Sequence, residues 1–163
     1  KWSADITYIH TEKDGWTYLA SVEDLYSRKI IGWAFGKTMD AELAKKALKN
    51  ASLNVKKTKG IILQTDLGSQ YTSNIFEEYL AELKIRHSYS RKGCPYDNSC
   101  IESFHSILKK EEVNLKKYKD FKDAYNAIFE FIEAWYNRER IHSSLNYRTP
   151  DEVYSNLEKL LVA

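Results

Sequence analysis

Long apolar runs and a strong net charge are missing from this sequence of 163 residues, and it has only two cysteines. The two cysteines, Cys94 and Cys100, are six positions apart, which fits neither a secreted disulfide framework nor the closer pairs of a structural zinc site. No segment approaches the roughly 18 consecutive apolar residues of a membrane-spanning helix, and the first residues form no signal-peptide pattern. We therefore expect free thiols in a reducing cytoplasm, and neither membrane insertion nor export.

The formal net charge is only +2, so the distribution of charge is more informative than its sum. Residues 43–60 carry six lysines and no acidic residue, and residues 84–119 carry nine basic residues against four acidic ones. Because polyphosphate binding depends on local charge, these two segments predict a nucleic-acid-binding surface. The alternative, a solvated lysine-rich helix face, stays open for both segments.

The bulk composition is that of a folded domain. Hydrophobic residues make up 43% and charged residues 29% of the chain, near the averages of globular proteins. The sequence has no repeat, low-complexity segment or linker, so residues 1–163 are expected to form one domain with a sizeable core. The chain starts at Lys1 rather than at a methionine, and we expect it to be part of a longer protein.

Runs of β-branched, aromatic and aliphatic residues, separated by turn residues, predict the strands. The first three are expected at 2–9, 16–22 and 28–35, and their short connections predict an antiparallel meander. Two further strands are expected at 60–65 and 85–88, and they alternate with helices. This alternation predicts an α/β protein with a mixed sheet, whose later strands join through crossover helices.

Apolar residues at helical spacing predict the helices. One is expected at 43–53 after an N-cap in residues 38–40, and Asn74 and Glu77 form a capping-box pair for the next. A last short helix is expected at 151–161. A long amphipathic helix before it is expected to turn one stripe toward the core: Phe121, Tyr125, Ile128, Ile132 and Trp135.

A basic loop with glycine and proline leads into another helix, which carries Glu102. Glu102 and Lys109 are seven residues apart, so their side chains point within about 20° of one another around the helix axis. His105, one turn after Glu102, is a weaker candidate for a functional role. Glu102 is expected at the edge of a buried stripe formed by Ile101, Phe104 and Leu108.

Two more acids stand out by their positions. Asp5 lies in the middle of a predicted strand, where aspartate is uncommon, and Asp66 lies at the carboxyl end of another, where sites in α/β sheets gather. If the two strands are neighbours, the carboxylates repel one another unless a cation lies between them. Mg²⁺ and Mn²⁺ prefer oxygen ligands, and a pair of such ions about 3.5–4 Å apart catalyses phosphoryl transfer. The alternative is that Asp5, Asp66 and Glu102 are a surface acid, a turn former and an ordinary helix charge.

The spacing of these acids matches a known superfamily. Asp66 and Glu102 are separated by 35 residues, and Asp5 precedes Asp66 by 60. With the segments that follow, this spacing resembles the catalytic core of DDE transposases of insertion sequences, in the bacterial group usually numbered three, and of retroviral-type integrases. The resemblance is carried by residues 2–9, 24–33, 65–73, 90–93, 95–98 and 102–104, and by Tyr136, Asn137, Arg140, His142, Ser143, Ser144, Leu145, Thr149 and Pro150.

The resemblance implies a ribonuclease H-like fold with a five-stranded mixed sheet, three strands antiparallel and two parallel, flanked by helices. It also implies that Asp5, Asp66 and Glu102 bind Mg²⁺ or Mn²⁺, two ions in all, and that Lys109 contacts DNA. The implied partners are transposon-end and target DNA and at least one further copy of the chain, in the bacterial cytoplasm at the nucleoid. The chain departs from the family where Gln64 and Leu67 replace the usual histidine and arginine.

Further candidates for DNA contact lie in the basic loop and the C-terminal segment. Arg91 and Lys92 are expected to bind phosphates, and Tyr96 either stacks on an unpaired base or packs against the helix. Arg140 and His142 are close in sequence, so His142 is a candidate for approaching the acids or a phosphate, with an ordinary surface histidine as the alternative.

The sequence therefore predicts a metal-dependent polynucleotidyl transferase that cuts transposon ends and transfers the 3′-hydroxyl to another strand. A ribonuclease H-like nuclease without strand transfer is one alternative, and a catalytically decayed DNA-binding or assembly module is another. The sequence shows no element for recognising transposon ends. We expect that function in an N-terminal DNA-binding region outside this chain.

Overall fold

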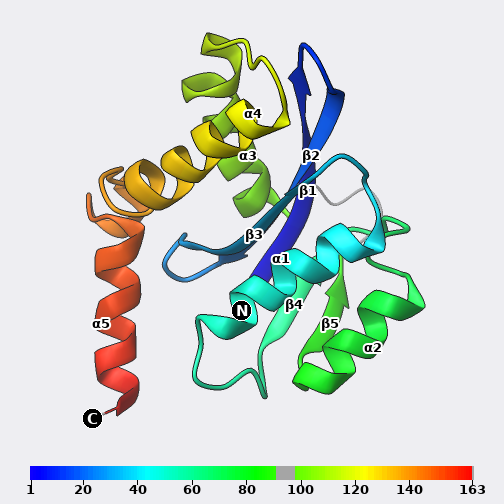
Figure 1. The fold of residues 1–163 in the computed structure, drawn as a ribbon. Coiled ribbons are helices and arrows are strands. Elements are labelled where there is room, and N and C mark those ends of the chain that lie inside the picture. The colour runs from blue at the N-terminus through cyan, green and yellow to red at the C-terminus, as the bar shows by residue number, and fades with distance from the viewer. Residues whose placement is uncertain (91–97, 163) are drawn as a thin grey trace.

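The computed structural model describes residues 1–90 and 98–162, with side chains as far as residue 156. One mixed sheet runs through the molecule, and helices cover both of its faces (Figure 1). The strand order is β3-β2-β1-β4-β5. The strands are β1 (Trp2–Thr11), β2 (Gly15–Asp24), β3 (Ile30–Gly36), β4 (Ile62–Thr65) and β5 (Arg86–Tyr89).

The predicted sheet topology is confirmed. Strands β1, β2 and β3 form an antiparallel meander, while β4 pairs in parallel with β1 on one side and with β5 on the other. The helices are α1 (Ala41–Leu53), α2 (Asn74–Leu83), α3 (Ser99–Glu111), α4 (Phe121–Phe129) and α5 (Pro150–Val162), with the π-helix η3 (Glu130–Tyr136) and the short 3₁₀-helices η2 (Val113–Leu115) and η4 (Ser143–Leu145).

Each face of the sheet has its own apolar core, because successive strand residues point to opposite sides. On one face, Trp2, Ala4 and Leu63 pack with α1 and α2. On the other face, Ile9 and Leu19 pack with α3, α4 and η3. Polar positions of β1 and β2 that point toward this second face therefore lie under α3.

A glycine allows α1 to approach the sheet closely. A Cβ atom added to Gly32 of β3 would lie 2.3 Å from the backbone nitrogen of Ala51 and 2.6 Å from the carbonyl oxygen of Ala47. Any side chain at Gly32 would therefore push α1 off the sheet. The N-cap predicted in residues 38–40 is confirmed, because Asp40 accepts a hydrogen bond from the backbone N–H of Leu43 at 2.9 Å.

Two details of the predicted helices are wrong. The N-cap of α2 is Ser73, one residue earlier than expected, and Glu77 bonds to His87 instead of closing a capping box. The long helix is α-helical only to Phe129 and continues as a π-helix in η3. The wider turn brings Phe131 and Tyr136 into the core, whereas Tyr125, which was expected in the buried stripe and precedes the turn, is 41% exposed.

Asn137 anchors the C-terminal segment to the sheet. Its side-chain oxygen accepts from the backbone N–H of Ile30, and its side-chain nitrogen donates to the carbonyl of Ile30, both at 3.0 Å. Its own carbonyl accepts from the backbone of Asp151, where α5 begins and extends away from the sheet (Figure 1). Within the described ranges no helix is long and apolar enough to cross a bilayer.

Candidate functional site

The first two acids of the candidate site lie on neighbouring parallel strands. The last paired residues of β1 and β4 are Ser3 and Gln64, and Asp5 and Asp66 each follow two residues further along the chain. Paired positions of parallel strands point to the same face of the sheet, so this register, continued by two residues past its last pair, brings Asp5 and Asp66 to the same side of the sheet. This arrangement is the one that a shared cation requires.

Asp5 is held by the backbone and by α3. One carboxylate oxygen, Oδ1, accepts from the backbone N–H of Ile6 at 2.8 Å, and the other, Oδ2, lies 3.4 Å from Nδ1 of His105. The second nitrogen of His105 lies 3.4 Å from the hydroxyl of Ser21, the residue opposite Asp5 on β2. His105 is buried and therefore fixes α3 over the strand that carries Asp5.

A buried tyrosine lies near both aspartates. Tyr71 is only 1% exposed, and its hydroxyl has no hydrogen-bond partner among the described residues. Burial raises the pKa of Tyr71 far above its usual value, and the charges of Asp5 and Asp66 raise this pKa further. The Tyr71 phenol therefore stays neutral and is close enough to both carboxylates to sense their charge.

Asp66 is exposed and follows the end of β4 in a tight turn. Its Oδ1 accepts from the backbone N–H of Gly68 at 2.9 Å, and a Cβ atom added to Gly68 would come within 2.9 Å of the same oxygen. Of the two residues that depart from the family pattern, Gln64 donates to the hydroxyl of Ser90 at 3.2 Å, and Leu67 is 58% exposed.

The third acid comes from α3. Ile101, Phe104 and Leu108 are buried as predicted, and Glu102 is exposed at the edge of that stripe. The start of α3 is tied to β1, because the hydroxyl of Ser3 donates to the side-chain oxygen of buried Asn98 at 2.7 Å. Glu102 and Asp5 line one open groove of about 430 Å³, which also contains His105, Ser106, Lys109, Lys110 and Asn114.

The donor set fits a divalent cation of the magnesium type, because carboxylate oxygens are the ligands that such ions prefer. Asp5 is the common member: it is level with Asp66 and shares a groove with Glu102. In the described part of the chain, no three histidine, cysteine, aspartate or glutamate side chains are already arranged to hold a metal.

Lys109 and Arg140 lie near acidic or aromatic groups. The Lys109 ammonium lies 4.1 Å from the ring centroid of Tyr8, and Lys109 also lines the groove of Asp5 and Glu102. Arg140 pairs with Glu111 at 3.4 Å and lies over the ring of Trp135.

His142 is buried, 5.2 Å from the ring of Tyr136, and lines a different pocket from the acids. The remaining expectations concern Arg91, Lys92, Tyr96 and Cys94, which lie outside the described residues.

Next to the acidic groove is a larger groove of about 550 Å³, at the end of the β1–β2 hairpin. Tyr8 and Trp16 are each 55% exposed there, with their rings 5.1 Å apart, and His10 packs on the other side of Trp16 at 5.0 Å. Lys109 and Asn114 line both grooves, so the two form one continuous surface. The larger groove also contains Lys116 and Lys117.

Sequence reasoning gave little weight to His105 and did not identify Tyr71 or the aromatic groove. A signal was present for the aromatic groove. Tyr8 lies between buried Thr7 and Ile9, and Trp16 precedes buried Thr17, an alternation which indicates that both rings point outward. The contact of His105 with Asp5 depends on how α3 crosses the sheet, so the sequence carries no direct signal for it.

Comparison with known families and sequences assigns the chain. Two family models described as "Integrase core domain" match residues 1–95 and 83–150. The transposase for insertion sequence element IS904 from Lactococcus lactis is 40% identical over 151 residues, covering 93% of this chain and 59% of that protein. Transposase InsF for insertion sequence IS3A from Escherichia coli is 41% identical over 152 residues, covering 93% of this chain and 52% of that protein. The chain thus spans little more than half the length of these relatives.

Solved structures agree on the fold. The integrase catalytic core domain of HTLV-2, solved in complex with magnesium, has a TM-score of 0.68 at 18% identity and covers 93% of both chains. A chain of the simian T-cell lymphotropic virus intasome, in complex with a PP2A regulatory subunit, has a TM-score of 0.71 at 19% identity, covering 93% of this chain and 52% of that one. The predicted ribonuclease H-like fold is therefore confirmed. The chain belongs to the integrase core domain family, and the transposases of insertion sequences are among its relatives.

Proposed function

We propose that this chain is the catalytic core of a transposase, a metal-dependent polynucleotidyl transferase. It would cut DNA at the ends of an insertion sequence and join the freed 3′-hydroxyl to another strand. The observation that carries the proposal is the register of β1 and β4, which makes Asp5 and Asp66 level beside a groove that contains Glu102. The similarity to insertion-sequence transposases supports the same reaction.

In this proposal Asp5, Asp66 and Glu102 hold two ions of Mg²⁺ or Mn²⁺. Bound ions would supply activation of the attacking hydroxyl and charge stabilisation of the leaving oxygen. The protein would contribute orientation: the Ile6 amide and His105 fix Asp5, and the Gly68 amide fixes Asp66. The neutral phenol of Tyr71 adds no further negative charge beside the two carboxylates.

The DNA strand is proposed to leave the acidic groove over Lys109 and to continue along the aromatic groove. Lysine ammonium groups at the edge suit backbone phosphates, and exposed rings suit unpaired bases, which stack on aromatic side chains without regard to sequence. Lys109, Lys116 and Lys117 supply the cations, and Tyr8 and Trp16 supply the exposed rings. Contacts by Arg91, Lys92, Tyr96, Arg140 and His142 remain part of the proposal.

The aromatic groove predicts weaker DNA binding when its rings are removed. Loss of one stacked base costs about 1–3 kcal/mol, so Tyr8→Ala is expected to weaken single-stranded oligonucleotide binding by about 5- to 150-fold. Fluorescence anisotropy of a labelled oligonucleotide measures the affinity. Tyr26→Ala is the matched control, because Tyr26 is 63% exposed at the opposite end of β2. If Tyr8→Ala and Tyr26→Ala bind the oligonucleotide with equal affinity, the aromatic groove is not part of the proposed DNA path.

The metal requirement gives the test of the proposed reaction. Supercoiled plasmid is a suitable substrate, because nicking it requires no transposon-end recognition. The chain is expected to nick plasmid in the presence of Mg²⁺ or Mn²⁺. EDTA is expected to abolish this nicking, and excess metal added afterwards is expected to restore it. Joining of an oligonucleotide 3′-hydroxyl to the plasmid would distinguish strand transfer from hydrolysis alone. Nicking that persists in EDTA would contradict the metal-dependent mechanism.

The proposal extends to partners that lie outside this chain. The HTLV-2 core was solved with magnesium in dimeric and trimeric forms, which supports self-association and a divalent ion here. We propose at least a dimer in the DNA complex, and recognition of transposon ends by an N-terminal region of a longer protein. A location at the bacterial nucleoid follows from the same proposal.

A further inference from the structure

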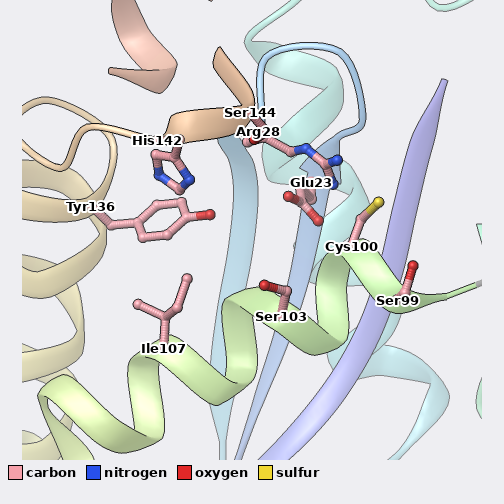
Figure 2. A pocket seen from close by; sticks show the side chains of 9 residues that line it. All are labelled: Glu23, Arg28, Ser99, Cys100, Ser103, Ile107, Tyr136, His142 and Ser144. Carbon is pink, nitrogen blue, oxygen red and sulfur yellow. The ribbon is translucent and has the colours of Figure 1, made fainter. Parts of the chain in front are cut away.

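A second polar pocket lies on the other side of α3, away from the acidic groove. It encloses about 190 Å³ between the start of α3, the end of β2, the turn that follows β2, and the C-terminal segment after η3. Figure 2 shows the Tyr136 hydroxyl and the Glu23 carboxyl pointing toward each other across it, with Ser103 below and His142 and Arg28 above. Apart from the DNA contact proposed for His142, the proposed function assigns no role to the residues of this pocket.

Glu23 is an unusual residue to find at this position. It is 1% exposed, and its Oε2 has no hydrogen-bond partner among the described residues. Burial raises the pKa of Glu23 to about 8, although the nearby charge of Arg28 partly offsets this effect. At neutral pH the side chain is therefore mostly a carboxylic acid, which can donate a hydrogen bond into the pocket.

His142 supplies a second unpaired group. Its Nδ1 lies 3.5 Å from a guanidinium nitrogen of Arg140, which can only donate, so Nδ1 is the acceptor. Burial, together with Arg140 and Arg28, lowers the pKa of His142 to about 4, and the neutral ring therefore carries its proton on Nε2. This Nε2 is buried without a partner among the described residues. The pocket thus contains an N–H group that has no hydrogen-bond acceptor among the described residues.

The helix that borders the pocket adds to this surplus of donors. The N-cap residue of α3, Asn98, makes no side-chain cap, because its oxygen accepts from Ser3 instead. Among the described residues, Asn98 therefore does not neutralise the positive end of the dipole of this 13-residue helix, although Glu102 in the same turn partly offsets it, and Cys100 of that turn lines the pocket. Arg28 provides a full positive charge. A cation is unsuited to this environment, and an anion with several oxygens is well suited.

We propose that this pocket binds a single phosphate-type oxyanion, with its charge met by Arg28 and its oxygens bonded by His142 and Tyr136. The volume has room for one tetrahedral ion and accompanying water. Two sources share this chemistry: a phosphate of the DNA backbone and free inorganic phosphate. The inference does not depend on the proposed catalytic role of the acids, because none of them lines this pocket.

Calorimetric titration with inorganic phosphate, against chloride at the same ionic strength, tests the proposal. The wild-type chain is expected to show saturable binding, and Arg28→Asn is expected to weaken it at least tenfold. Arg28 has φ +63°, a conformation that asparagine adopts readily, so this variant keeps the fold while removing the charge. Arg138→Gln, which removes an exposed guanidinium elsewhere, is expected to change the affinity by less than twofold. Absence of saturable binding, or equal binding by Arg28→Asn, would overturn the assignment.

The pH dependence gives a second readout. The charged and titratable groups around the acid come from every neighbouring element: Asp24, Arg28, Cys100, Tyr136, Arg140 and His142. An anion repels ionised Glu23, so affinity is expected to be full below pH 8 and to fall as the pH rises through about 8. Sulfate is the probe, because its charge is constant over this range. The fall is expected to disappear in Glu23→Gln, and an equal fall in that variant would overturn the place of Glu23 in the site.

Oligonucleotide binding distinguishes the two sources. If the occupant is a backbone phosphate, Arg28→Asn weakens oligonucleotide binding as well, and inorganic phosphate competes with the oligonucleotide. If the occupant is free phosphate, Arg28→Asn loses phosphate and keeps its affinity for the oligonucleotide. Both results support an oxyanion site, whereas wild-type protein that binds no phosphate refutes it in either case.

Discussion

Asp5→Asn is expected to lower the rate of plasmid nicking by about 10³-fold, because a metal-held carboxylate contributes several kcal/mol of transition-state stabilisation. Asparagine has the same shape and still offers an oxygen to the backbone N–H of Ile6, so the fold is expected to persist. Glu102→Gln is expected to cause a loss of similar size. Rates measured with Mg²⁺ and with Mn²⁺ give the comparison.

The matched control for this experiment is Glu82→Gln. Glu82 is exposed on α2, so the same change of charge on a helix surface is expected to leave the rate within about twofold. Mn²⁺ titration adds a readout that does not depend on activity, because Asp5→Asn is expected to bind the ion more weakly. Full activity in Asp5→Asn would refute the proposed catalytic centre.

Asn137→Ala is expected to destabilise the fold by about 3–5 kcal/mol, more than any surface substitution. Asn137 is 1% exposed and satisfies both the N–H and the carbonyl of Ile30. Alanine would leave two buried backbone groups without partners, each at a cost of about 1–3 kcal/mol, and would also open space in the core. Urea unfolding followed by circular dichroism measures the change.

Asn126→Ala is the control for this prediction. Asn126 is exposed on α4, and alanine is the better helix former, so the free energy of unfolding is expected to change by about 0.5 kcal/mol or less. Equal unfolding midpoints for Asn137→Ala and the wild type would show that water replaces the lost hydrogen bonds. The link between β3 and η3 would then not contribute to stability.

The strands and most helices were predictable because their signals are local. Strand-type sequence runs separated by short turns predicted β1, β2 and β3. The apolar stripe of Ile101, Phe104 and Leu108 predicted the buried side of α3. The α2 cap was misplaced because Ser73 and Asn74 are both good caps and adjacent. The π-helical turn after Phe129 was missed because helical periodicity assumes 3.6 residues per turn.

The sequence by itself determined the family and pointed to Asp5, Asp66 and Glu102 as the candidate acids, because a motif spacing is a property of the chain. Only the tertiary structure decided that Asp5 and Asp66 are level, since strand register depends on pairing between residues about 60 positions apart. It also decided that His105 touches Asp5 and that Glu23 is enclosed with His142 and Arg28. These contacts arise from the way α3 and the C-terminal segment pack on the sheet, and long-range packing has no signature in local sequence.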